Sequence, residues 1–114
     1  MRDETLYLLH IIECIDRIGD YLAGGWETYS ASSLIEDAVL RRLQVMGEST
    51  QKLSRETKDA YPEIPWAQIA GMRNVLTHGY FSIDAEQVRH TVTYDLPALK
   101  SVAATILASR GGAG

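Results

Sequence analysis

The stretch SLIEDAVLRRLQVMGESTQKLSRET, residues 33–57, decides the fold that this sequence predicts. Its first four residues match a capping box, in which the side chains of Ser33 and Glu36 satisfy the free amide groups of a helix start. Mostly apolar residues then recur every three or four positions, which is the spacing of one helical stripe. The stripe consists of Ile35, Ala38, Val39, Arg42, Met46, Ser49 and Leu53. The stretch therefore predicts a long helix from Ser33 to about Thr57, with a buried face that becomes partly polar midway.

The residues before this stretch predict a first helix from Asp3 to about Leu22. Ala23-Gly24-Gly25 stops it, because paired glycines supply the positive φ angles that a helix exit uses. A loop with Trp26 and Tyr29 is expected to lead into the next helix. The apolar stripe of the first helix is Leu8, Ile11, Ile12, Ile15, Ile18 and Leu22.

The residues after the opening stretch begin with a break at Pro62 and Pro65, since each proline lacks an amide hydrogen and pushes its predecessor to an extended conformation. Pro65 also suits the first turn of a third helix. This helix is expected to be short, to end at His78 and to have Gly79 as its C-terminal cap. Its apolar face consists of Trp66, Ile69, Ala70, Val75 and Leu76.

A fourth helix is predicted from an aspartate cap at Asp84 to about Ser109, and Pro97 should kink or divide it. Four amphipathic helices with short connections predict an all-α protein, an antiparallel four- to five-helix bundle of the up-and-down type. The 114 residues suit one domain, residues 1–109, and the glycine-rich end, residues 110–114, is expected to be a flexible tail. The apolar residues of the fourth helix are Val88, Val92, Leu96, Leu99, Ala103 and Ile106.

Charge and cysteine content exclude several classes of protein. The net charge of −4 argues against a protein that coats nucleic acid, so any contact with RNA must be local. Cys14 is the single cysteine, which rules out a disulfide within the chain, and its place in an apolar stripe predicts a buried thiol. The start of the chain lacks the features of a signal peptide, and no window approaches the ~20 apolar residues of a membrane span. We therefore expect a cytoplasmic protein with no membrane partner.

Polar and ionisable groups of complementary chemistry gather in Arg73-Asn74-Val75-Leu76-Thr77-His78-Gly79-Tyr80, at the end of the third predicted helix. Asn74 and His78 stack on one helical face, whereas Arg73 starts about 140° away from His78, so it must reach around the helix or meet a second copy of the segment. His78 can exchange a proton near neutral pH, Arg73 can hold a phosphate oxygen, and Asn74 could orient the imidazole. This set suits phosphodiester cleavage by an internal 2′-hydroxyl. It lacks the ligands of a metal site, and neither a metal nor a cofactor is expected.

Each of these residues also has a purely structural interpretation. A histidine in the last turn of a helix interacts favourably with the helix dipole and needs no catalytic role. Arg73 and Asn74 could form a solvated or interhelical polar face, and Tyr80 could pack beside the residue that follows it. The two other histidines, His10 and His90, are expected to be structural or exposed.

The spacing of Arg73, His78 and Tyr80 resembles the R-x4-H-x-Y signature of HepT-like toxins, the minimal nucleases of the HEPN superfamily. The resemblance extends over residues 35–107 and includes the sequence around the motif. The similar segments are Gly47-Glu48, Ile64-Pro65-Trp66, Gly71-Met72-Arg73-Asn74, the run from Gly79 to Asp84, and Asp95-Leu96-Pro97.

This resemblance implies a homodimer with both motifs at a shared cleft and a metal-independent endoribonuclease with Arg73 and His78 as catalytic residues. It implies a toxin that cuts RNA such as tRNA or mRNA, not DNA. The implied partner is a small nucleotidyltransferase antitoxin, which neutralises the toxin by AMP transfer to Tyr80 or by simple binding. Glu48 could be a buried partner of Arg73 across the bundle that orients the arginine without reacting.

Two other interpretations remain open. In the first, the protein is a non-catalytic helical module whose cleft binds a nucleotide or a partner protein, with Asn74 and His78 as ligand contacts. In the second, the motif is only part of a structural bundle. Replacing His78 with alanine separates them: an enzyme loses RNA cleavage but keeps its fold, a binding module loses affinity for its partner, and a structural bundle changes only in stability.

Overall fold

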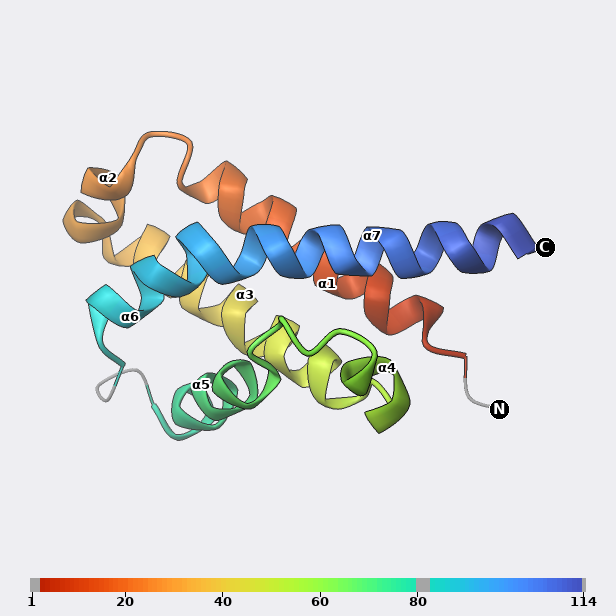
Figure 1. The fold of residues 1–114 in the computed structure, drawn as a ribbon. Coiled ribbons are helices and arrows are strands. Elements are labelled where there is room, and N and C mark those ends of the chain that lie inside the picture. Colours follow the sequence, from red (N-terminus) through yellow and green to blue (C-terminus); the bar gives the residue numbers. More distant parts are fainter. Residues whose placement is uncertain (1–2, 80–82, 114) are drawn as a thin grey trace.

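The computed structural model describes residues 3–79 and 83–113, which are almost entirely helical and contain no strand (Figure 1). The predicted all-α class is therefore confirmed. None of the helices in this part of the chain is long and apolar enough to cross a membrane. In chain order the elements are α1 (Thr5–Tyr21), α2 (Trp26–Ala31), α3 (Ser33–Gln51), α4 (Arg55–Asp59), α5 (Trp66–His78), α6 (Ala85–His90), the π-helical turn η2 (Thr91–Asp95) and α7 (Leu96–Ala113).

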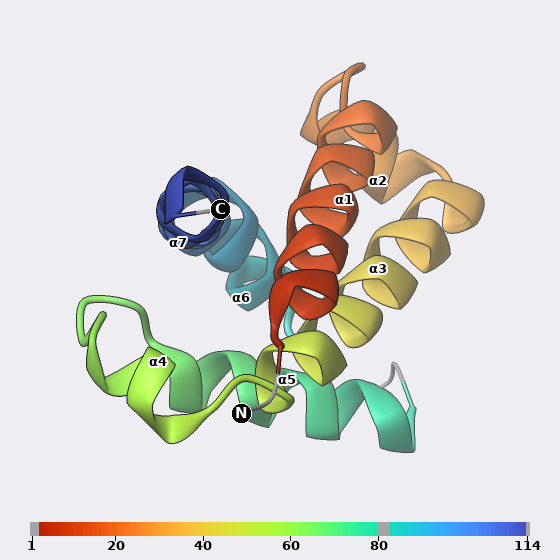
Figure 2. The same ribbon diagram turned by 90° about the vertical axis from the view of Figure 1, so that its right-hand side faces the viewer.

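Helices α1, α3 and α7 run in alternating directions along the molecule, whereas α5 lies across this direction (Figures 1 and 2). Helix α1 packs against both α3 and α7, and α5 packs against α3. Figure 2 shows α5 crossing below α3, away from α7. The apolar stripes meet in a core whose large, fully buried members include Leu8, Ile11, Ile18, Leu40, Leu43, Met46, Leu96 and Leu99.

The single cysteine lies in this core. Cys14 is 2% exposed, so the predicted buried thiol is confirmed. Burial raises the pKa of the Cys14 thiol, and a hydrogen bond with Arg42 only partly opposes that rise. A thiol that stays protonated and buried is a packing residue and a poor nucleophile.

The segment between α1 and α3 differs from the prediction in two ways. Residues 26–31 form the short helix α2, where a loop was expected, and Gly25 begins it with a φ of 95°, a conformation that glycine adopts without strain. The cap of α3 is Ser32, which accepts a hydrogen bond from the Ile35 amide at 3.3 Å, so Ser33 is the first helical residue and caps nothing. The capping box was placed one residue too late.

Helix α3 is also shorter than predicted, because it ends at Gln51 and the chain turns before α4. Ser54 has an extended backbone and its hydroxyl accepts a hydrogen bond from the Thr57 amide, which caps α4. The backbone amide of Ser54 donates to the carboxylate of Glu4 at 2.9 Å. The prediction that this helix continues to Thr57 was therefore wrong. Glu4, from the start of the chain, accepts a hydrogen bond from the Ser54 amide, so this amide does not continue the helix.

The end of the chain confirms one expectation and corrects another. The irregularity expected at Pro97 is present as η2, which widens the helix just before the residue that cannot donate an amide hydrogen. The last helix, which was expected to end at about Ser109, instead continues as α7 to Ala113. Arg110 contributes to this extension, because its guanidinium lies 3.7 Å from an Asp3 oxygen and 3.8 Å from a Glu4 oxygen.

Candidate functional site

The candidate site is built where α5 crosses α3. Gly47 of α3 faces Arg73 of α5 so closely that a Cβ atom on Gly47 would lie 2.5 Å from the Cβ of Arg73. Real Cβ atoms essentially never approach another heavy atom that closely, so a side chain at position 47 would force the helices apart. The glycine thus fixes the base of the Arg73 side chain on the surface of α3, beside Glu48.

The guanidinium of Arg73 contacts residues of both helices. Its Nη2 lies 3.7 Å from Oε1 of Glu48, and its Nη1 donates a hydrogen bond of 3.2 Å to Oδ1 of Asn74. The amide of Gln51 donates to the same Asn74 oxygen at 3.4 Å. The partner that the sequence suggested for Arg73, Glu48, is thus within ion-pair distance, but it is not buried as predicted. Because the side chains of Arg73 and Glu48 are 27% and 44% exposed, water screens the pair, and it serves orientation more than stability.

One donor of Arg73 has no partner. Among the buried side-chain nitrogen and oxygen atoms of the described residues, only the Nε of Arg73 makes no hydrogen bond. Leaving a buried donor unpaired costs about 1–3 kcal/mol, and native proteins rarely tolerate it without a reason. The Nε itself is closed to solvent, so an anionic oxygen could approach only the exposed part of the side chain, whose guanidinium Glu48 and Asn74 hold in place.

His78 occupies the last position of α5 and its side chain is exposed. Gly79 ends the helix with a φ of 131°, which confirms the predicted C-terminal cap. His78 follows Arg73 by five positions, which corresponds to about 7.5 Å along the helix axis and about 140° around it. The Arg73 guanidinium contacts Glu48 and Asn74, whereas His78 lies at the end of α5, and no hydrogen bond joins Arg73 to His78 among the residues that the structure describes.

Asn74 has a different neighbour from the one predicted. Its carbonyl oxygen accepts hydrogen bonds from Arg73 and Gln51, and no hydrogen bond joins it to His78 among the residues that the structure describes. The side chain that was expected to orient the imidazole therefore orients the arginine. Gln51 was not predicted, although it lies three positions after Glu48 and four after Gly47 on the same face of α3, and this spacing is the signal that would have found it.

The other predicted residues lie outside the described part of the chain or on its surface. Tyr80, the expected AMP acceptor, falls in residues 80–82, outside the described part of the chain. His10 and His90 are exposed, in agreement with the prediction. Within residues 3–79 and 83–113, no three histidine, cysteine, aspartate or glutamate side chains lie close enough together to hold a metal ion.

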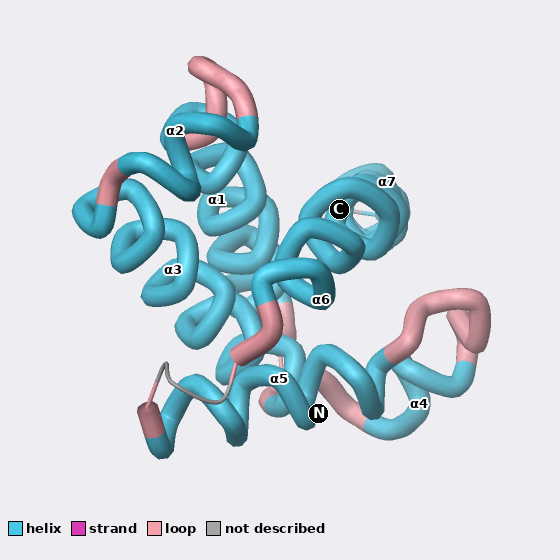
Figure 3. The backbone as a smooth tube through the Cα atoms, turned by 90° about the vertical axis from the view of Figure 1, so that its left-hand side faces the viewer, coloured by secondary structure: helices cyan, strands magenta, loops and turns pink. Residues whose placement is uncertain are grey.

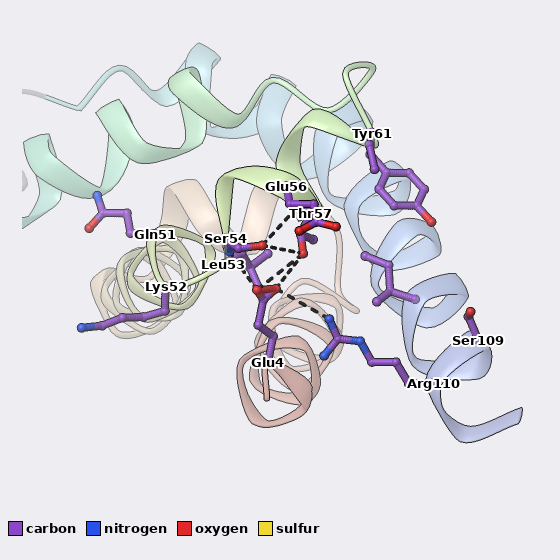
Figure 4. A pocket seen from close by; sticks show the side chains of 12 residues that line it. Glu4, Gln51, Lys52, Leu53, Ser54, Glu56, Thr57, Tyr61, Ser109 and Arg110 are labelled. Atoms are coloured by element: carbon purple, nitrogen blue, oxygen red, sulfur yellow. Dashed lines mark hydrogen bonds and ion pairs between the residues drawn. The ribbon is translucent and has the colours of Figure 1, made fainter. Parts of the chain in front are cut away.

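A pocket of about 670 Å³ lies on the other side of Gln51, between the start of α1, helix α4 and the end of α7 (Figure 4). Its most buried polar group is the carboxylate of Glu4, which accepts hydrogen bonds from the Ser54 amide at 2.9 Å and the Thr57 hydroxyl at 2.8 Å. Burial raises the pKa of Glu4, but these hydrogen bonds and Arg110 outweigh burial and leave the pKa below its ordinary value of 4.5. This carboxylate is fully paired and ionised, so it stabilises the fold.

Comparison with known proteins gives a consistent result. Residues 11–106 match the model of the family described as "Ribonuclease HepT-like". A Methanocaldococcus jannaschii protein, "Gamma-glutamylcyclotransferase and putative RNase MJ0434", is 36% identical over 87% of this chain, and the match covers 45% of that longer protein. "Putative RNase MJ1216" of the same organism is 35% identical over 87% of this chain and 83% of its own length. "Probable ribonuclease HepT" of Thermococcus cleftensis is 35% identical over 87% and 91%. No solved structure gives a significant match.

Proposed function

The chain belongs to the HepT-like ribonuclease family, and from this premise we propose that it is a metal-independent endoribonuclease with Arg73 and His78 as its catalytic residues. The observation that carries the proposal is the state of Arg73. Its guanidinium is positioned by Gly47, Glu48 and Asn74, yet its Nε has no hydrogen-bond partner within the described residues. The Arg73 side chain is 27% exposed, so the guanidinium that these neighbours orient remains open to a phosphate oxygen.

The proposed reaction needs only the RNA and these side chains. The ribose 2′-hydroxyl attacks the adjacent phosphorus, its proton passes to a base, and the bond to the 5′-oxygen of the next nucleotide breaks as that oxygen gains a proton. The products are a 2′,3′-cyclic phosphate and a free 5′-hydroxyl. The imidazole of His78 can serve in these proton transfers because a histidine side chain both accepts and donates protons in general acid–base catalysis. Arg73 donates hydrogen bonds to a non-bridging oxygen, where negative charge increases in the transition state.

A homodimer is part of the proposal, because Arg73 and His78 start about 140° apart around α5. A two-fold axis near the end of α5 would place His78 of each copy near the α5 helix of the other, and the two motifs would then line one cleft. The exposed position of His78 at the end of the helix is compatible with such an arrangement.

We further propose that the protein is the toxin of a toxin–antitoxin pair and acts in the cytoplasm on an RNA such as tRNA or mRNA. Its antitoxin would be a nucleotidyltransferase that transfers AMP to Tyr80. Tyr80 follows His78 by two positions, so the phosphate of an AMP group would compete with the RNA phosphate for Arg73. This part of the proposal rests on the resemblance of the motif to the HepT-like toxins.

The test is incubation of the purified protein with total RNA in excess EDTA. The variants Arg73→Ala and His78→Ala should lose cleavage, while two matched controls should keep it. The controls are Arg55→Ala, whose side chain is 93% exposed on α4, and His10→Ala, which is exposed on α1. Cleavage by the wild type and both controls, with 2′,3′-cyclic phosphate ends, supports the proposal.

Two outcomes would contradict the proposal. If the wild type is folded, is free of AMP on Tyr80 by mass spectrometry and still cleaves no RNA, the chain is not a ribonuclease on its own. The alternative of a non-catalytic module that binds a nucleotide or a partner protein in the same cleft would then replace it. If Arg73→Ala or His78→Ala cleaves as fast as the wild type, the nuclease uses other residues.

A further inference from the structure

A second cluster of aromatic and basic side chains lies at the end of the molecule formed by α2, α6 and η2 (Figure 3). These elements enclose a pocket of about 390 Å³. Pockets that bind small ligands or parts of larger ones have volumes of about 300–1,000 Å³. The lining residues are Trp26, Glu86, Arg89, His90, Thr93 and Tyr94.

Trp26 forms one side of this pocket and contacts a buried tyrosine and an arginine. The ring of Trp26 meets the buried ring of Tyr29 edge-on, with 5.4 Å between their centroids. Burial raises the pKa of Tyr29 to about 12, so its phenol remains neutral and acts as a packing residue. The guanidinium carbon of Arg89 lies 5.5 Å from the Trp26 ring centroid, which is within cation–π distance. Arg89 is therefore positioned while its side chain remains exposed.

The other side carries two accessible rings that contact each other at a tilt. The His90 and Tyr94 rings are 5.0 Å apart and tilted by 45°, and Tyr94 is 66% exposed. Tyr94 belongs to η2, and π-helical turns of this kind occur frequently at functional sites. The core does not need this tyrosine, since most of its surface is in contact with water.

The position of the cluster relates it to the candidate active site. The end of α5, which bears His78, and helix α6 lie at the same end of the molecule (Figures 1 and 3). The chain between His78 and Ala85 is short enough to span at most about 25 Å. An extended RNA strand that enters the active site can therefore reach the cluster within a few nucleotides.

We propose that this cluster is a second RNA-binding subsite, in which Tyr94 and His90 stack on an unpaired base and Arg89 pairs with a backbone phosphate. Single strands are recognised by this combination of exposed aromatic rings and positive charge. The carboxylate of Glu86 can accept hydrogen bonds from the amino groups of a base. A local site of this kind suits a chain with a net charge of −4, which cannot attract RNA over its whole surface. The subsite rests on the proposed function, because the strand that it binds is the substrate of Arg73 and His78.

The first experiment measures binding of a single-stranded RNA of about twelve nucleotides, a length within the usual footprint of such sites, carrying 2′-O-methyl groups so that it cannot be cleaved. Tyr94→Ala should raise the Kd by about five- to tenfold, because loss of a base–aromatic stack has an effect of at least this size. Tyr94→Phe keeps the ring and should bind like the wild type. Arg89→Gln should reduce the slope of log K against log salt concentration by about 0.7, the contribution of one phosphate contact to a single strand. Arg55→Gln on α4 is the matched control and should change neither quantity.

The second experiment compares cleavage of that RNA sequence, unmodified, with cleavage of a dinucleotide that is too short to reach the cluster. Tyr94→Ala should raise KM for the long RNA and leave dinucleotide cleavage unchanged. If the wild type cleaves both the long RNA and the dinucleotide, and Tyr94→Ala cleaves each with the same kinetics, the proposed subsite is wrong and the proposed function stands. If the wild type cleaves neither but Tyr94→Ala still weakens binding, the catalytic proposal is wrong and the RNA site stands. If the wild type does not bind the long RNA at all, both are wrong.

Discussion

Two polar clusters flank the C-terminal half of α3, and they differ in how completely their charged groups are paired. Glu4 is 3% exposed, and its oxygens accept hydrogen bonds from Ser54 and Thr57 and lie near Arg110. Arg73 is more exposed, and its Nε has no partner within the described residues. A fully paired buried charge stabilises one arrangement of the chain, whereas a positioned charge that remains partly exposed can stabilise a ligand. The difference is the one expected if the Glu4 cluster serves the fold and the Arg73 cluster serves the proposed chemistry.

The largest effect is expected when Arg73 loses its planar fork but keeps its charge. In Arg73→Lys, a single ammonium cannot contact Glu48 and Asn74 and also donate to a phosphate oxygen, so cleavage should slow by about a hundredfold. The free energy of unfolding should change by less than about 1 kcal/mol, because the ion pair with Glu48 is screened. Cleavage rates and urea unfolding measure the two quantities. A lysine variant that cleaves at the wild-type rate would show that charge alone suffices and that the fork geometry has no role.

Gly47→Ala should affect both stability and cleavage. The new Cβ would lie 2.5 Å from the Cβ of Arg73, so α5 must move away from α3 at a cost of about 1–3 kcal/mol. The displaced guanidinium should reduce cleavage by about tenfold or more, since errors of an ångström in position have effects of this size. Gly71→Ala is the matched control, because a Cβ there meets nothing within 4 Å and alanine favours the helix. Equal cleavage by both alanine variants would contradict the role assigned to the close contact.

The same two clusters show what sequence patterns can and cannot predict. The stripes of α1, α3, α5 and α7 follow from the spacing of apolar residues, because burial of one helical face depends on local periodicity. The end of α3 does not follow, since it depends on a hydrogen bond from Ser54 to Glu4, fifty positions earlier in the chain. The helical extension past Ser109 likewise involves Arg110 and the acidic residues near the N-terminus.

In the candidate site, the motif predicted which residue types are present, but it did not predict which neighbours their side chains contact. Arg73 and its neighbour Glu48 were both expected, and their ion-pair distance agrees with that expectation. Asn74 was expected beside His78, because the two share a helical face. Its oxygen instead contacts Arg73 and Gln51 because α3 lies on that side of α5. Which neighbour a side chain selects depends on how two helices pack, and periodicity within one helix does not contain that information.

Glu4→Gln should weaken the fold and leave cleavage intact. The neutral amide loses charge-assisted hydrogen bonds, so the free energy of unfolding should fall by about 1–3 kcal/mol at neutral pH. The pKa of Glu4 is lowered in the folded protein, so its contribution is present above the unfolded value of 4.5 and is lost as pH falls through the lower folded value. The difference in unfolding free energy between wild type and variant should therefore shrink from about pH 7 to about pH 3. Glu63→Gln, at an exposed position, should show no such difference at either pH. A Glu4→Gln variant that is stable but inactive would assign this cluster to the chemistry.

The smallest effect is expected for Gln51, which adjoins both clusters. It lines the Glu4 pocket and donates to Asn74 at 3.4 Å, a long hydrogen bond between exposed side chains. Gln51→Ala should slow cleavage by about two- to fivefold, in line with the loss of one weak hydrogen bond that orients another residue. Asn74→Ala should have a larger effect, because Asn74 contacts Arg73 directly. If Gln51 acts only through Asn74, adding Gln51→Ala to the Asn74→Ala variant should slow cleavage no further. Additive effects on the rate would instead mean that Gln51 contacts the RNA itself, and the catalytic surface would then extend to the edge of the Glu4 pocket.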